Sequence, residues 1–184
     1  MKKLALVTGA SAGLGVEFAR QLAERGYSLV LAARRRDRLE RLARELGDAR
    51  AVAIDLSGKD AAAKLFANIV EAGEELDLLV NNAGAGLIGA FAALEPSRQR
   101  QMIDLNIGAL VDLCRAVAPT MIARRSGGII NVASTAAFQP GPKMAVYFAT
   151  KAFVLSFTEA LHEELKPHGV SVSCLCPGPT RTEF

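Results

Sequence analysis

Tyr147 and Lys151 stand four residues apart in the segment Tyr-Phe-Ala-Thr-Lys. On a helix, side chains at this spacing lie one turn apart on the same face, so the lysine ammonium can act on the phenol. A free tyrosine has a pKa of ~10, and a nearby positive charge favours its phenolate. The pair therefore predicts acid–base chemistry, although the same spacing also occurs by chance on solvated helix faces.

The segment from Thr8 to Gly15 is a candidate phosphate loop. It reads Thr-Gly-Ala-Ser-Ala-Gly-Leu-Gly and lies where a predicted strand passes into a predicted helix. Glycines permit a tight turn, and the helix directs free N–H groups and the positive end of its dipole at an anion. An ordinary glycine-rich turn is the alternative, but the position after the first strand favours dinucleotide binding. The expected cofactor contacts in this loop are Gly9, Ser11, Gly13, Leu14 and Gly15.

The end of the second predicted strand indicates which dinucleotide binds. An NAD site offers an acidic residue there for the ribose hydroxyls, whereas this chain reads Ala-Ala-Arg-Arg-Arg from Ala32. Guanidinium groups suit the 2′-phosphate of NADP, so we expect NADP(H) as cofactor and Arg34 as its main contact. For Arg35, Arg36 and Arg38 taken singly, the start of a charged helix is the better interpretation. Nearby acidic residues argue against a nucleic-acid patch.

The elements that must position these residues follow from the hydropathy pattern, in which apolar runs alternate with amphipathic runs. Strands are expected at Leu4–Thr8, Ser28–Ala33, Ala51–Ile54, Leu76–Asn81, Gly128–Ala133 and Val170–Leu175. Helices are expected at Leu14–Arg25, Asp37–Leu46, Lys59–Glu71, near Ser97–Arg125 and at Val146–Lys166. We therefore expect an α/β fold with a doubly wound parallel sheet, Rossmann-like with strand order 3-2-1-4-5-6. Such a sheet binds ligands at the carboxyl ends of its strands.

The composition favours one soluble, cytoplasmic domain covering residues 1–184. The chain is 51% hydrophobic, and its net charge of +3 is too small to demand nucleic acid or an anionic membrane as partner. The first apolar run ends at Thr8, too early for a signal peptide, and no apolar stretch approaches the ~18 residues of a membrane span. Cys174 and Cys176 should point the same way along one strand, so we expect free thiols. Neither histidine has a cysteine at metal-ligand spacing, so no metal site is expected.

The loop from Thr8 to Gly15 resembles the Thr-Gly-x-x-x-Gly-x-Gly loop of the short-chain dehydrogenase/reductase family, with Leu14 at a position often held by Ile. Four further motifs match that family in the same order along the chain. They are Asn-Asn-Ala-Gly from Asn81, Ser134, the Tyr147 and Lys151 pair, and Pro-Gly-Pro-Thr from Pro177. The resemblance covers essentially the whole chain.

This resemblance implies further cofactor contacts. The corresponding positions are Asp55 and Leu56 beside the adenine, Asn82, Ala83 and Gly84 along the adenosine ribose, and Pro177, Gly178 and Thr180 beside the nicotinamide. For Asp55, helix capping is an equal alternative. The Asn-Asn-Ala-Gly and Pro-Gly-Pro segments also have the composition of simple turns.

The resemblance also implies a catalytic set of Asn106, Ser134, Tyr147 and Lys151 that interconverts a carbonyl and an alcohol by hydride transfer. Tyr147 would be the acid–base residue, Ser134 would bind the substrate oxygen, Lys151 would hold the nicotinamide ribose, and Asn106 would position a water. An ammonium at ~5 Å with an effective dielectric of ~20 supplies roughly 3 kcal/mol towards a lower phenol pKa. Lys151 alone is thus expected to be nearly sufficient, with the positive nicotinamide supplying the remainder.

The chain also departs from the family. It stops at Phe184, whereas family members usually continue with a substrate lid and a seventh strand, so we expect an incomplete carboxyl end and a missing substrate-selecting part. The substrate is expected to be a small carbonyl or alcohol. Candidate pocket residues are Gly86, Leu87, Ile88, Phe138 and Gln139, with local packing as the alternative.

The helices at 97–125 and 146–166 are expected to form a homo-dimer or homo-tetramer, as in the family, with internal burial as the alternative. A non-catalytic nucleotide-binding regulatory or scaffold protein of the same fold is the alternative function.

Overall fold

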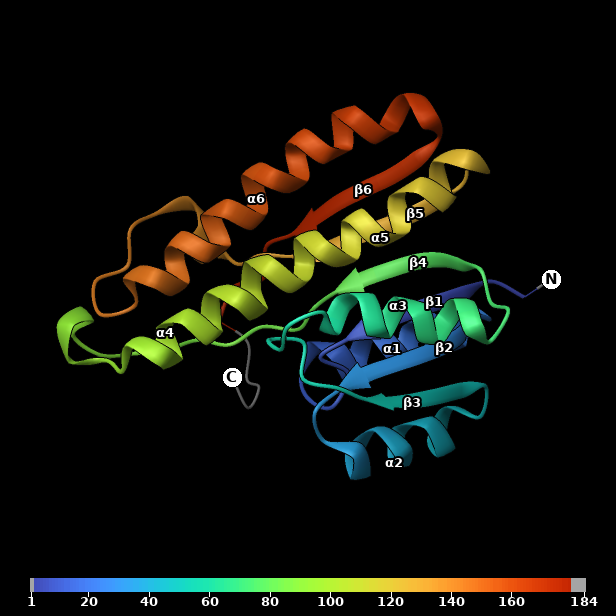
Figure 1. Ribbon diagram of the computed structural model, residues 1–184, viewed down its shortest axis with the longest axis horizontal. Coiled ribbons are helices and arrows are strands. Elements are labelled where there is room, and N and C mark those ends of the chain that lie inside the picture. The colour runs from blue at the N-terminus through green and yellow to red at the C-terminus, as the bar shows by residue number, and fades with distance from the viewer. Residues whose placement is uncertain (1, 180–184) are drawn as a thin grey trace.

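A six-stranded parallel sheet lies at the centre of the computed structural model, which describes residues 2–179. The strands are β1 (Leu4–Thr8), β2 (Ser28–Ala33), β3 (Ala49–Ala53), β4 (Leu76–Asn81), β5 (Gly127–Val132) and β6 (Val170–Leu175). The helices are α1 (Leu14–Glu24), α2 (Arg36–Leu46), α3 (Ala61–Glu71), α4 (Pro96–Ile103), α5 (Ala109–Ala123) and α6 (Ala145–Leu165). The strand order β3-β2-β1-β4-β5-β6 confirms the predicted doubly wound fold (Figure 1).

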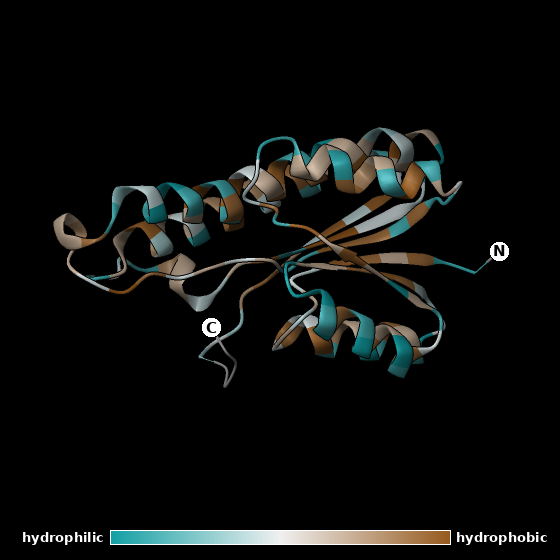
Figure 2. Ribbon diagram, turned by 60° about the horizontal axis from the view of Figure 1, so that its bottom comes forward, coloured by the Kyte–Doolittle hydropathy of each residue, from teal (hydrophilic) through white to brown (hydrophobic). Residues whose placement is uncertain are grey.

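Each face of the sheet carries its own hydrophobic core, because successive side chains of a strand point to opposite faces. Leu4 and Leu6 pack with α3, α5 and α6, whereas Ala5 and Val7 pack with α1 and α2. Figure 2 shows the resulting layers of helices on both sides of the sheet. Burial on both faces explains why the strands are apolar throughout rather than alternating.

The helix predicted near Ser97–Arg125 differs from expectation, because a π-helical turn at Asp104–Gly108 separates α4 from α5. Single π turns inside helices frequently occur at functional sites. This turn contains Asn106, a predicted site residue. Several other boundaries differ by one or two residues; among them, β3 begins at Ala49 and α3 begins at Ala61.

The same helical run, Pro96–Ala123, is long and apolar enough by length and composition alone to cross a membrane. The sequence-based expectation that no stretch reaches this length is therefore wrong. The run lies against the sheet, where Leu110, Leu113, Val117 and Met121 are buried in the core shared with α3 and α6. These contacts account for its apolar composition as a core helix.

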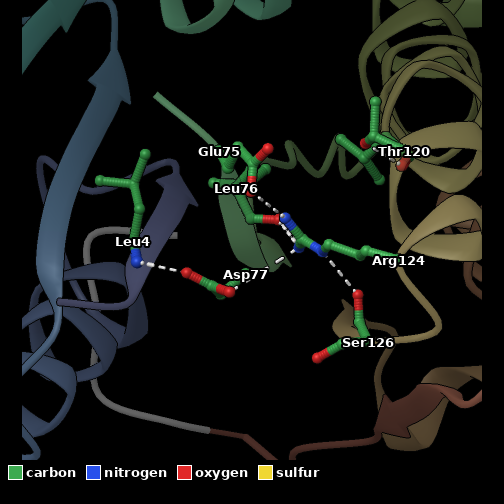
Figure 3. Close-up of polar contacts among 8 residues, drawn as sticks. Leu4, Glu75, Leu76, Asp77, Thr120, Arg124 and Ser126 are labelled. Carbon is green, nitrogen blue, oxygen red and sulfur yellow. Dashed lines mark hydrogen bonds and ion pairs between the residues drawn. The ribbon is translucent and has the colours of Figure 1, made fainter. Parts of the chain in front are cut away.

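Polar contacts fix the end of the sheet opposite to the carboxyl ends of the strands (Figure 3). The guanidinium of Arg124, just after α5, donates to the backbone carbonyls of Leu76 and Ser126. The Asp77 carboxylate lies 3.8 Å from the same guanidinium and accepts a hydrogen bond from the Leu4 backbone N–H at 2.8 Å. These contacts join β1, β4 and the end of α5. They support the pairing of β1 with β4, whose carboxyl ends lead into the loops at Gly9 and Asn82.

Candidate active site

A cleft of about 720 Å³ opens at the carboxyl ends of the strands. Segments that follow all six strands contribute to its wall, as expected for a parallel sheet whose order reverses between β1 and β4. One end of the cleft is formed by the glycine loop and the arginines after β2. The wall also includes Ser134, Tyr147 and Lys151. The cleft therefore joins the predicted phosphate-binding and catalytic residues.

Close backbone packing shapes the glycine loop. Gly9 has a φ of 66°, and a Cβ there would lie 2.9 Å from the Cα of Ala83. The Asn82 side chain donates to the Thr8 carbonyl at 2.9 Å, which ties the loop after β4 to the loop after β1. A Cβ on Gly15 would lie 2.3 Å from the Gly9 carbonyl oxygen, so only glycine fits there.

Most predicted residues of the loop line the cleft, namely Gly9, Ser11, Gly13 and Leu14. Gly15 does not; it is buried behind the loop and has a packing role. Gly13 precedes α1 without a side-chain cap, so the amino end of this helix keeps backbone N–H groups available beside the cleft.

Two arginines line the cleft after β2. Arg34 is exposed, as expected for a ligand contact, while Arg35 is half-buried and donates to the Ser11 hydroxyl at 3.1 and 3.2 Å. Arg35 caps the charged helix α2, as the alternative interpretation predicted, and its guanidinium also folds back onto the glycine loop. Arg36 fits that interpretation, since it is exposed and pairs with Glu40 at 3.8 Å. The contact of Arg35 with Ser11, which is distant in sequence, distinguishes it from Arg36.

Asp55 and Leu56 both line the cleft after β3. The Asp55 carboxylate accepts hydrogen bonds from the Ser57 backbone N–H and hydroxyl, at 3.0 and 2.7 Å. Because α3 begins only at Ala61, with Asp60 in the capping position, the helix-cap interpretation of Asp55 is wrong. Asn82, Ala83 and Gly84 line the next part of the wall, as predicted.

Asn106 bridges two segments behind the cleft without lining it. Its amide nitrogen donates to the Ala85 carbonyl at 2.9 Å and to the Thr150 hydroxyl at 3.0 Å, and its amide oxygen accepts from the Ala85 N–H at 2.9 Å. A Cβ on Gly84 would lie 3.4 Å from this oxygen and 3.6 Å from the Lys151 Nζ. Thr150, which anchors Asn106 to α6, was missed by sequence reasoning. Its position directly before Lys151 was the available signal.

Lys151 is buried on α6 and donates from Nζ to the Val132 carbonyl at 2.8 Å. Its Nζ lies 5.9 Å from the centre of the Tyr147 ring, so the predicted one-turn spacing brings the two groups together. Burial lowers the pKa of Lys151 from its ordinary 10.5 to about 8. The buried environment thus makes the ammonium easier to deprotonate.

Burial also raises the pKa of Tyr147, against a smaller lowering by its hydrogen bond with Ser134. Burial thus opposes the lowering that Lys151 is expected to provide, and the sufficiency of Lys151 alone stays a prediction. The sequence places the lysine ammonium and the tyrosine phenol one helical turn apart. It does not reveal the burial of Tyr147, which opposes ionisation of the phenol.

Ser134 joins the loops after β5 and β6. Its hydroxyl accepts from the Ala136 N–H at 3.1 Å and lies 3.5 Å from the Pro177 carbonyl oxygen, to which it donates. The Thr135 N–H donates to the same carbonyl at 3.0 Å. Pro177 and Gly178 line the cleft as predicted, whereas Thr180 lies outside the described residues.

Of the predicted substrate-pocket residues, Gln139 lines the cleft. Leu87 lines a separate small cavity, and Ile88 and Phe138 are 76% and 66% exposed. Met144 and Phe148, which flank Tyr147, line the cleft and were not predicted.

Comparisons with known proteins agree with this arrangement. A family model described as short chain dehydrogenase matches residues 3–184. Serine 3-dehydrogenase of Rhizobium radiobacter is 38% identical over 181 residues, which cover 97% of this chain and 72% of that protein.

Solved structures show the same similarity. A short-chain dehydrogenase from Sphingobium yanoikuyae in complex with NADPH has a TM-score of 0.93 and 38% identity, covering 98% of this chain and 72% of that one. A metagenomic short-chain oxidoreductase in complex with NADP has a TM-score of 0.91 and 38% identity, covering 97% and 83%.

Proposed function

Because the chain belongs to the short-chain dehydrogenase family, we propose that it is a cytoplasmic NADP(H)-dependent oxidoreductase that interconverts a small carbonyl and its alcohol. One observation carries the proposal. A single cleft is lined by a glycine loop with flanking arginines and by Tyr147, Ser134 and Lys151. When bound, the cofactor supplies the hydride, and the residues of the chain supply and hold the proton.

The residues of the cleft fit a dinucleotide phosphate. Gly9 and Gly13 line the cleft beside the amino end of α1, which favours a phosphate there. Arg34 and Arg35 offer two guanidinium groups to a 2′-phosphate, and no carboxylate stands at the end of β2 to select the free ribose hydroxyl. The NADPH and NADP complexes of the two similar structures support this cofactor choice.

Tyr147 is proposed as the proton donor in the reduction direction. A phenol with an ordinary pKa of ~10 carries its proton at neutral pH, and Tyr147 can donate that proton to an oxygen that develops negative charge. The Ser134 hydroxyl, hydrogen-bonded to Tyr147, can bind the same substrate oxygen. In the oxidation direction, Tyr147 must become a phenolate, which the positive charge of Lys151 favours.

Asn106 is proposed as a positioning residue rather than a catalytic one. Its amide joins Ala85 to Thr150 on α6, the helix that carries both Tyr147 and Lys151. It does so beside Gly84, whose missing side chain leaves space between Asn106 and Lys151. Fixing α6 against the loop after β4 would keep the proton donor aligned with the cleft.

The outer side of α6 is proposed as a homo-oligomer contact. Phe153 is 40% exposed and stacks on Phe157, with ring centres 5.8 Å apart. Size-exclusion chromatography with light scattering tests this idea: Phe153→Glu should shift an oligomer to monomer, and a wild-type monomer would reject it.

The catalytic assignment is tested with Tyr147→Phe. This variant should bind NADPH with a dissociation constant close to that of the wild type, measured by isothermal titration, but should lose turnover across a panel of aldehydes and ketones. Unchanged turnover would remove Tyr147 from the mechanism. If the wild type binds NADPH but turns over no carbonyl in the panel, the result would support the alternative of a non-catalytic nucleotide-binding protein.

Arg34→Ala tests the cofactor choice. It should weaken NADPH binding much more than NADH binding, because only NADPH carries the 2′-phosphate. Equal losses for the two cofactors would reject the phosphate-clamp assignment.

A further inference from the structure

Cys174 and Cys176, hereafter the β6 dithiol, lie side by side at the end of β6 with their Sγ atoms 3.8 Å apart. Both are free, half-buried thiols on the face of β6 that packs against the core shared with α6. A disulfide bond is ~2.05 Å long, so only a short approach separates this pair from a covalent link. Among the described residues, no other two thiols lie within such reach.

The backbone that carries the β6 dithiol also anchors the wall of the cleft. The carbonyl of Leu175, between the two cysteines, accepts from the Ala133 N–H at 2.8 Å. The carbonyl of Pro177, directly after Cys176, accepts from the Thr135 N–H at 3.0 Å and from the Ser134 hydroxyl at 3.5 Å. We expect that closing a disulfide across a two-residue spacing strains this strand end and displaces one of these carbonyls.

We propose that the β6 dithiol is an oxidative modification site, at which a peroxide closes an intrachain disulfide that distorts the cleft beside Ser134 and weakens cofactor binding. One thiolate attacks the peroxide O–O bond, which gives a sulfenic acid and, after protonation, water. The second thiol then displaces the sulfenic oxygen as a second water and forms the S–S bond. Two electrons and two protons pass from the sulfurs to the peroxide, and a thiol reductant reverses the step.

The remaining cysteine provides an internal contrast. Cys114 is 2% exposed, its Sγ accepts from the Asn81 amide at 3.3 Å, and burial raises its pKa to about 12. Because peroxide has little access to so buried a thiol, Cys114 should stay reduced under the same treatment. Burial raises the pKa of Cys174 to about 11, so disulfide closure should become faster as pH rises towards that value.

The experiment uses the full chain, with hydrogen peroxide as the oxidant and Cys114→Ser as the matched control. Intact mass and peptide mapping should show loss of two hydrogens and a link between Cys174 and Cys176, in both wild type and Cys114→Ser. Cys174→Ser and Cys176→Ser should not form the link. The oxidised wild type should bind NADPH about tenfold more weakly, the scale of one lost hydrogen bond, and dithiothreitol should restore its affinity.

The disulfide is read by mass, so it is tested independently of the proposed function, on which only the NADPH effect rests. The proposed disulfide site is refuted by any of three results: oxidation stops at a single cysteine, the disulfide links two chains, or both thiols stay reduced. A disulfide that leaves NADPH affinity unchanged overturns the coupling to the cleft, provided that the reduced protein binds NADPH. If the serine variants fail to fold, the mapped link in the wild type and its reversal by dithiothreitol decide the question.

Discussion

Replacing Lys151 with methionine is expected to stabilise the folded protein near pH 7 while abolishing turnover. Lys151 is 6% exposed, and burial lowers its pKa from 10.5 to about 8. Since one pKa unit corresponds to ~1.36 kcal/mol, this fall represents about 3 kcal/mol of destabilisation from burying the ammonium charge. Methionine has a similar length and no charge to bury.

A smaller cost opposes this gain, because the substitution leaves the Val132 carbonyl without its hydrogen bond from Nζ. An unsatisfied buried acceptor costs ~1–3 kcal/mol, so the net stabilisation near pH 7 should be about 1 kcal/mol. The sign reverses at high pH. The pKa of the folded state lies below that of the unfolded state, so the penalty is complete below pH 8 and disappears as the pH rises to 10.5.

Urea unfolding of wild type and Lys151→Met between pH 7 and 10.5 measures this directly. Between pH 7 and 10.5, the free energy of unfolding of the wild type should rise by about 3 kcal/mol relative to that of the variant. The two plots of unfolding free energy against pH should therefore cross. Lys64→Met, at an exposed site on α3, is the control and should run parallel to the wild type. A difference between wild type and Lys151→Met that stays constant with pH would refute the burial argument.

Three further predictions concern the frame of the site. Arg35→Ala should weaken NADPH binding by a factor of ten or more in titration calorimetry, since a charged hydrogen bond is worth ~1.5–3 kcal/mol, whereas Arg36→Ala should change it little. Gly15→Ala should lower the urea midpoint strongly, because its Cβ would lie 2.3 Å from a backbone oxygen, while Gly108→Ala, with open space around it, should be neutral or stabilising. Thr150→Val should lower kcat more than it raises KM for NADPH, because it removes a hydrogen bond to Asn106; equal changes would assign it a role in binding.

The sequence predicts the sheet well because the physics behind it is local. Apolar runs such as Leu4–Thr8, which Gly9 follows, alternate with amphipathic runs, and this alternation indicates a parallel sheet. The same holds for residues placed by backbone geometry, such as Gly9, whose positive φ favours glycine. What remained hidden depends on contacts between distant segments. The Ser11 hydroxyl separates Arg35 from Arg36, and it comes from another loop.

The protonation states of the site show most clearly why spacing is not enough. Burial moves the pKa of Lys151 down to about 8 and that of Tyr147 up, so both shifts favour the neutral forms of the two groups. Burial therefore opposes an ammonium beside a phenolate, whereas the positive charge of Lys151 favours the phenolate. The phenolate needed for alcohol oxidation requires further positive charge, which an oxidised nicotinamide would supply on binding. Under the proposed function, the cleft then favours a neutral proton donor for reduction, and bound oxidised cofactor favours the base for the reverse reaction.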